Sequence, residues 1–178
     1  DVPQSEWFYS AVQYVYGNGM MSGTDPDLFS PNVTTTRGMI VTILYRLEGR
    51  PAVSAAPFRD VPASQYYASA VAWASENGIV SGYGDGIFGP EDTITREQMA
   101  SILYRYANYK GYDMSGTADL SIYVDAGKIS PYAMTALQWA NANGLVSGTT
   151  PETLTPGGSA TRAQVASILM RFCKNIAG

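Results

Sequence analysis

Histidine is absent from the sequence, and cysteine occurs once, as Cys173. Without histidine the chain can form no Ser-His-Asp or Cys-His catalytic centre, no His-ligated zinc site and no imidazole acid–base pair. A single cysteine gives neither an internal disulfide nor a cysteine-rich metal site, so we expect Cys173 to be a structural thiol. These absences exclude many routes to catalysis, and we predict no enzyme activity, no cofactor and no bound metal.

Charge of either sign is also scarce. Charged residues make up 15% of the 178 residues, whereas an average domain has about 25%. Eleven basic and fifteen acidic residues give a net charge of −4, and a nucleic-acid-binding protein normally presents a basic face instead. No apolar run reaches the roughly 18 residues of a membrane span. We therefore expect neither a nucleic-acid partner nor membrane insertion.

Internal repetition dominates what is present. Five short motifs occur three times in the same order, and repeats are the first feature to establish in a sequence. The copies occupy residues 1–47, 58–106 and 120–175, joined by the Gly-, Ala-, Ser- and Pro-rich connectors 48–57 and 107–119. The recurring pairs are Asn18-Gly19, Asn77-Gly78 and Asn143-Gly144; Ser22-Gly23, Ser81-Gly82 and Ser147-Gly148; Thr36-Arg37, Thr95-Arg96 and Thr161-Arg162; Ile43-Leu44, Ile102-Leu103 and Ile168-Leu169, with a single Pro at 31, 90 and 156.

Each repeat predicts two helices, because apolar residues recur on one helical face in two segments. The Asn-Gly pair ends the first helix, since glycine accepts the left-handed backbone that a helix C-terminus often needs. The second helix begins after the Thr of Thr-Arg, where Thr95 with Gln98 and Thr161 with Gln164 have the spacing of a capping box. The first repeat has Thr36 but Met39, so we expect the cap without the box.

The predicted fold class is mainly α with short β segments. No second helix can bury its apolar stripe alone, whereas three equivalent stripes can bury against one another around a pseudo-threefold axis. We therefore predict three tandem helix-loop-helix repeats around a central helical bundle, with residues 1–178 as one cooperative domain. The apolar stripes are Phe8, Ala11, Val12, Val15; Tyr67, Ala70, Val71, Ala74; Ala133, Ala136, Leu137, Ala140; and Ile40, Ile43, Leu44, Leu47; Met99, Ile102, Leu103, Tyr106; Val165, Ile168, Leu169, Phe172.

The repeats resemble the S-layer homology family, whose pattern runs Phe-x-Asp-Val, an aromatic-led helix, Gly-Ile-x-x-Gly, Phe-x-Pro and Thr-Arg-Ala-Glu. The second repeat matches nearly throughout, at Phe58, Asp60, Val61, Tyr66, Ala70, Val71, Trp73, Gly78, Ile79, Gly82, Phe88, Pro90, Thr95 and Arg96. The family Glu is missing from all three repeats, and Leu154 replaces the Phe of the third. These departures predict that the grooves of the three repeats do not bind a ligand equally well.

The resemblance implies a three-pronged fold and a non-catalytic role. It implies extracellular attachment at the cell surface of a Gram-positive-type bacterium, by binding a secondary cell wall polysaccharide, often pyruvylated, in grooves between repeats. A different class of function, protein–protein interaction or self-assembly with other surface-layer copies, remains as the alternative. The sequence opens on Asp1-Val2-Pro3, so either a leader has been removed or the chain is a piece of a longer protein. Because the sequence ends six residues after Phe172, we expect that piece to be the C-terminal end.

The resemblance implies groove roles for Arg37, Arg96 and Arg162. The residues support the same expectation, because a cation at a helix start opposes the helix dipole and therefore needs a reason. A guanidinium beside free N–H groups would suit a carboxylate or phosphate. Alternatively, each arginine pairs with a local acid or packs its stem across the preceding loop.

Further candidates for the glycan site are aromatic, glycine and aspartate residues. Trp7, Tyr66 and Tyr132 share one position of the first helix, and Tyr14, Trp73 and Trp139 share another. Flat rings suit sugars but also fill cores. Gly23, Gly82 and Gly148 permit either a turn or close approach of a ligand, and Asp60 is either a turn residue or a sugar contact. The predicted glycan-binding set is Arg37, Arg96, Arg162, Trp73, Trp139, Tyr66, Gly23, Gly82, Gly148 and Asp60.

Overall fold

Each repeat forms two α-helices in the computed structural model, which describes residues 1–178. The fold is mainly helical, as predicted, and the β structure amounts to isolated bridges rather than strands. No helix combines the length and the apolar composition needed to cross a bilayer. The helices are α1 (Tyr9–Gly17), α2 (Arg37–Leu47), α3 (Ala68–Glu76), α4 (Arg96–Lys110), α5 (Met134–Ala142) and α6 (Arg162–Asn175), with short 3-10 turns η1 (Ala126–Lys128) and η2 (Pro131–Ala133) before α5.

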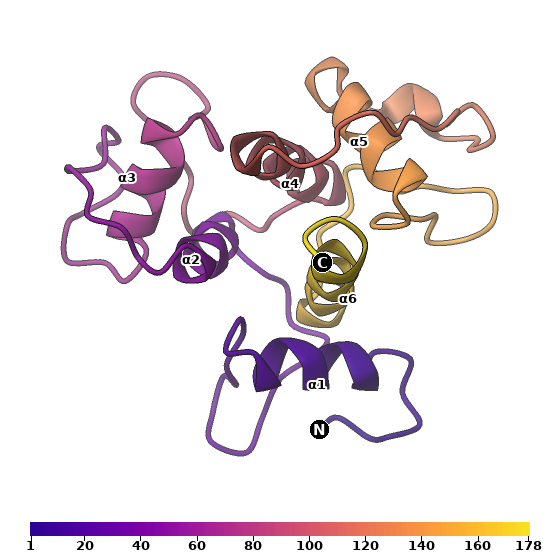
Figure 1. The fold of residues 1–178 in the computed structure, drawn as a ribbon, viewed down its shortest axis with the longest axis horizontal. Helices are drawn as coiled ribbons and strands as arrows, with labels where there is room; N and C mark the ends of the chain where they lie inside the picture. Colours follow the sequence, from indigo (N-terminus) through magenta and orange to yellow (C-terminus); the bar gives the residue numbers. More distant parts are fainter.

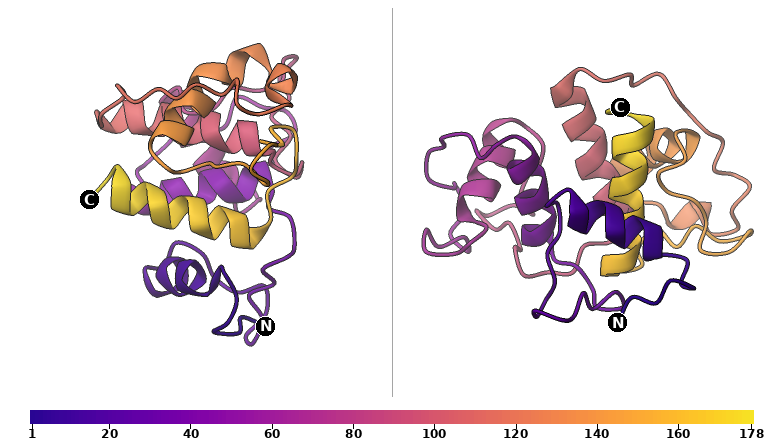
Figure 2. Two further views of the ribbon diagram at one scale, coloured as in Figure 1. Left: turned by 90° about the vertical axis from the view of Figure 1, so that its right-hand side faces the viewer. Right: turned by 60° about the horizontal axis from the view of Figure 1, so that its bottom comes forward.

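Three prongs surround a central group of helices. Figure 1 shows α2, α4 and α6 nearly end-on at the centre, with α1, α3 and α5 spread around them. Figure 2 shows from the side that the central helices run in the same general direction. The prediction of a three-pronged arrangement around a helical bundle is confirmed.

Each outer helix packs on a central helix of a different repeat. The second helix of each repeat packs on the first helix of the next, in the pairs α2 with α3 and α4 with α5. The last helix, α6, packs on the first, α1, which closes the arrangement into a ring. Every repeat therefore depends on both of its neighbours for burial of its apolar faces.

A cyclic set of backbone hydrogen bonds links the segments that lead into the central helices. The N–H of Thr35 donates to the carbonyl of Ala160 at 3.0 Å, that of Ala160 to Ile94 at 2.9 Å, and that of Ile94 to Thr35 at 2.8 Å. All three residues are buried, so each bond satisfies groups that water does not reach. This three-bond ring fixes the starting points of α2, α4 and α6 relative to one another.

The predicted stripes form the core. Every residue of the three first-helix stripes is buried, and so is every second-helix stripe residue except Leu47, which lies exposed at the end of α2. The capping predictions are also confirmed: Thr95 and Thr161 form complete capping boxes, and Thr36 caps with its hydroxyl alone. The glycines of the three Asn-Gly pairs have φ of 66°, 68° and 70°, as a left-handed helix end requires.

One ion pair connects the C-terminal ends of α2 and α4. Glu48 Oε1 accepts a hydrogen bond from the Tyr106 hydroxyl at 2.6 Å and lies 2.9 Å from Lys110 Nζ. Burial raises the pKa of Glu48, but the hydrogen bonds from Tyr106 and Lys110 outweigh burial and hold this pKa below its ordinary value. The carboxylate form is therefore favoured by folding.

We expect the contribution of Glu48 to stability to depend on pH. Because its pKa is lowered on folding, the stabilisation is present above the unfolded pKa and is lost as the pH falls through the folded pKa. Glu48→Gln should lower the free energy of unfolding by about 1 kcal/mol near neutral pH and by much less in acid. Denaturant unfolding of both proteins across the acidic range measures this, and an equal difference at every pH would contradict it.

Candidate functional site

Three equivalent grooves lie between the repeats. Each is bounded by a Ser-Gly-x segment on one side and by the second helix of the same repeat on the other. The first groove, of about 330 Å³, lies between Ser22–Thr24 and α2. The second, of about 510 Å³, lies between Ser81–Tyr83 and α4, and the third, of about 300 Å³, lies between Ser147–Thr149 and α6.

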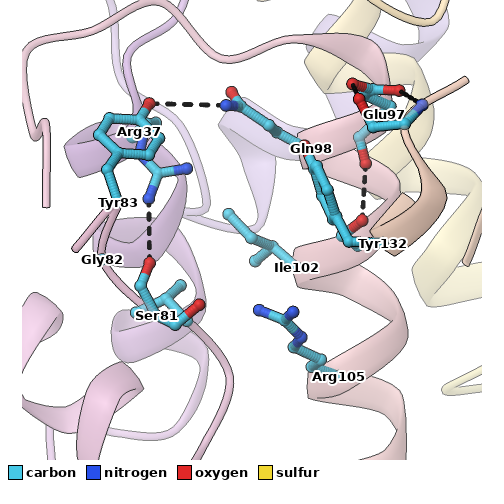
Figure 3. Close-up of a pocket in the computed structure, with 12 residues that line it drawn as sticks. Arg37, Ser81, Gly82, Tyr83, Glu97, Gln98, Ile102, Arg105 and Tyr132 are labelled. Atoms are coloured by element: carbon cyan, nitrogen blue, oxygen red, sulfur yellow. Dashed lines mark hydrogen bonds between the residues drawn. The ribbon is translucent and has the colours of Figure 1, made fainter. Parts of the chain in front are cut away.

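All three repeats contribute to every groove. In the second groove, shown in Figure 3, Arg37 comes from the first repeat, Ser81–Tyr83 and α4 from the second, and Tyr132 from the third. The ring closure extends this pattern, because Arg162 reaches the first groove and Trp7 reaches the third. A ligand in any groove therefore contacts a surface that exists only when neighbouring repeats are packed together.

The three Thr-Arg arginines are buried, and each bonds to a neighbouring repeat, so we call them latch arginines. Arg37 donates from Nε to the carbonyl of Phe88 at 3.0 Å and from Nη2 to that of Ser81 at 3.3 Å. Arg96 makes the same pair of bonds to Leu154 and Ser147, and Arg162 makes them to Phe29 and Ser22. Burial lowers the pKa of all three guanidinium groups, but arginine remains protonated in proteins.

The helix N-termini themselves are not free for an anion, which corrects that part of the sequence interpretation. The N–H of Arg37 donates to the carbonyl of Asp92 at 2.9 Å, and that of Gly38 to Pro90 at 2.8 Å. The starts of α4 and α6 bond to the neighbouring repeat in the same way, and the capping Thr satisfies the third amide. The alternative of a local acidic partner is not what the structure shows either, because all three guanidinium groups donate to backbone carbonyls.

A second set of arginines lines the grooves and was missed by the sequence interpretation. Arg46, Arg105 and Arg171 lie at one register of α2, α4 and α6 and are exposed or half-buried. None of them forms an ion pair, since the Glu48–Lys110 pair is the only one in the chain. The signal was available, because an arginine follows Ile-Leu by two residues in every repeat.

The two aromatic positions have opposite roles, and the first of them lies just before the first helix of each repeat rather than within it. Trp7, Tyr66 and Tyr132 are 64%, 58% and 56% exposed, and each lines one groove. Trp73 and Trp139 are only 2% and 1% exposed, and neither lines a groove. The structure thus places Tyr66 where it was predicted and moves both tryptophans from the predicted site into the core.

The predicted glycines line the grooves, one in each, because a larger residue would not fit there. A Cβ on Gly23 would lie 2.6 Å from the carbonyl oxygen of Leu28, and those on Gly82 and Gly148 would overlap the carbonyls of Ile87 and Thr150. Asp60 lies outside the grooves, where its carboxylate accepts the N–H groups of Phe88 and Gly89. Asp60 therefore acts as a brace for the loop that Arg37 contacts.

Chemically, each groove offers a charged donor, hydroxyls and a flat ring. A guanidinium recognises carboxylates through paired N–H donors, and an exposed ring can stack on the apolar face of a sugar. Ser22, Ser81 and Ser147 add exposed hydroxyls beside the arginines. This combination suits a sugar that carries an anionic group.

Known proteins resemble this chain in sequence. An endoglucanase from a Bacillus species is 32% identical over 99% of this chain, and a surface-layer 125 kDa protein from Lysinibacillus sphaericus is 31% identical over 93%. A cellulosome-anchoring protein from Acetivibrio thermocellus is 28% identical over 85%. The chain spans 19%, 14% and 34% of these proteins, respectively. The S-layer homology domain matches residues 1–38, 57–100 and 122–166, and the chain therefore belongs to the S-layer homology family, with three tandem motifs.

Proposed function

We propose that this chain is a non-catalytic module that attaches a larger protein to the bacterial cell surface. Its ligand is an acidic secondary cell wall polysaccharide, whose pyruvate ketals supply the carboxylates. The observation that carries this proposal is the set of three unpaired arginines, Arg46, Arg105 and Arg171, each facing a groove that also holds an exposed ring. In a chain with only 11 basic residues, three such positions without an acidic partner suit an external anion.

The relatives support an attachment role. Their names describe an enzyme, a surface-layer protein and an anchoring protein, so their remaining segments serve different purposes. What they share with one another and with this chain is the S-layer homology segment. Attachment to a common surface is a role that all three could use.

The test uses the groove arginines rather than the latches, because the latches also hold the repeats together. We expect the triple variant Arg46→Ala, Arg105→Ala, Arg171→Ala to bind isolated Gram-positive cell walls at least about tenfold more weakly than the unmodified chain. The triple variant Arg50→Ala, Arg59→Ala, Lys128→Ala, which removes three exposed basic residues outside the grooves, is the control for net charge. Circular dichroism should show that all variants stay folded.

Treatment of the walls identifies the ligand. Binding should disappear when the secondary polysaccharide is extracted, and it should weaken when mild acid removes the ketals. Binding that survives extraction and is indifferent to the arginines would overturn the proposal. Such a result would favour the alternative, a module that docks proteins or assembles with its own copies.

A further inference from the structure

The second groove differs from the other two in the surroundings of its latch arginine. The Arg37 guanidinium carbon lies 4.5 Å from the centroid of the Tyr83 ring and 4.6 Å from that of Phe88, so this cation contacts two aromatic rings. Arg162 in the first groove stacks on Phe29 alone, and Arg96 in the third groove stacks on no ring. Thr24 and Thr149 occupy the positions that correspond to Tyr83.

A buried carboxylate also belongs to the second groove alone. Glu97 lies at the second position of α4, where α2 has Gly38 and α6 has Ala163. Its Oε1 accepts the Ser130 hydroxyl at 2.6 Å and its Oε2 accepts the Ser130 N–H at 3.0 Å. These neutral donors hold the carboxylate in place without cancelling its charge.

The formal charge of the grooves therefore differs. Two arginines line the first and third grooves without any acid, whereas Glu97 offsets one of the two arginines in the second groove. A charge within a few ångströms of a bound anion acts through an effective dielectric constant lower than that of water. Such a charge changes the affinity for the anion by about tenfold. The largest groove is thus the least suited to a carboxylate.

The second groove offers aromatic rings and neutral hydrogen-bonding groups that suit an uncharged sugar. Tyr83 and Tyr132 are both more than half exposed, and Figure 3 shows Tyr83 across the groove from α4 and Tyr132 on the side of α4. The hydroxyl of Tyr83 accepts a hydrogen bond from Gln98 Nε2 at 3.5 Å, and Ser81 adds an exposed hydroxyl. Two rings with neutral donors and acceptors between them suit the hydroxyl and amide groups of a sugar.

We infer that the second groove takes a neutral sugar unit, while the first and third grooves take the acidic unit of the same polymer. This inference rests on the proposed function and refines it. Glu97 and Tyr83 are the residues that set the difference: Glu97 lowers the positive charge, and Tyr83 covers the face of Arg37. A single polymer could then be held at an acidic, a neutral and an acidic unit in the first, second and third grooves.

The test follows one backbone amide in each groove, those of Gly23, Gly82 and Gly148, by nuclear magnetic resonance. The probes are the single ketal-bearing sugar unit released from the wall polysaccharide, and the same sugar unit after acid removal of its ketal. We expect the acidic probe to shift Gly23 and Gly148 at concentrations about tenfold lower than Gly82. The neutral probe should shift Gly82 most strongly.

Two variants test whether Glu97 and Tyr83 cause the difference between the second groove and the other two. Glu97→Gln removes the charge and can still pair with Ser130, its amide oxygen accepting the Ser130 N–H and its NH2 group donating to the Ser130 hydroxyl. Tyr83→Thr installs the residue type found at this position in the other grooves. Each variant should bring the response of Gly82 to the acidic probe closer to the responses of Gly23 and Gly148. In the double variant, all three glycines should respond at similar concentrations.

The outcomes separate this inference from the proposed function. Equal midpoints for all three glycines with the acidic probe, or no response of Gly82 to the neutral probe, would overturn the inference and leave carbohydrate attachment standing. Unchanged behaviour of both variants would show that Glu97 and Tyr83 only brace the fold. If neither probe shifts any of the three glycines, the proposed function itself fails.

Discussion

Trp73→Ala should lower the free energy of unfolding by about 3–5 kcal/mol, the range for removing a large aromatic side chain from a well-packed core. Trp73 is almost fully buried and packs against Tyr45, Tyr106 and Tyr109, which come from the second helices of two repeats. The cavity would therefore open at a junction between repeats. Denaturant unfolding followed by circular dichroism measures the loss.

Trp7→Ala is the matched control, because Trp7 is exposed and lines the third groove. It should change stability by less than about 0.5 kcal/mol while weakening glycan binding at that groove.

Phenylalanine variants of the two buried tryptophans test the role of the indole N–H. Trp139 Nε1 donates to the carbonyl of Asp113, whereas Trp73 Nε1 has no partner. Trp139→Phe should thus cost more than Trp73→Phe, and the reverse order would contradict this account of the two sites.

Arg37→Ala is expected to destabilise the chain by about 3 kcal/mol. The variant loses two hydrogen bonds from a charged donor, leaves the buried Phe88 carbonyl unsatisfied, and removes the cation–π contacts with Tyr83 and Phe88. Arg162 has one ring and Arg96 has none, so the cost should fall in the order Arg37, Arg162, Arg96. Thermal and denaturant unfolding of the three variants gives the order directly.

Lysine should not rescue these positions. Its single ammonium group cannot donate to two carbonyls in the fixed geometry of a guanidinium, and it is more strongly hydrated. Arg46→Ala, by contrast, should leave stability nearly unchanged because Arg46 is exposed and unpaired. Similar losses for Arg37→Ala and Arg46→Ala would show that the Thr-Arg arginines are not latches between repeats.

The local features of the fold could be predicted because they depend on neighbouring residues. The spacing of Ile40, Ile43 and Leu44 sets a buried face, and the hydroxyl of Thr95 with the amide of Gln98 sets a helix start. Leu47 follows the same spacing and is nevertheless exposed, because α2 ends there. A periodic pattern identifies a face but does not tell how far the neighbouring helices extend along it.

The site was harder to predict, because its roles depend on contacts between repeats. Trp73 and Tyr66 are both aromatic residues of one segment, and the packing of residues from α2 and α4 against α3 decides which is covered. The role of Arg37 likewise depends on carbonyls in the next repeat. Arg105 could have been found, since its position recurs in all three repeats, but repetition does not distinguish a latch from a ligand contact.

The closing of α1 onto α6 limits how such modules can grow. An open solenoid lengthens one repeat at a time, with caps at its ends, whereas a fourth repeat here would have to break the three-bond ring of Thr35, Ile94 and Ala160. Stronger attachment would then come from linking a second complete trio by a tether. Its gain would arise from avidity, set by tether length and by the spacing of sugars along the polymer rather than by any new contact.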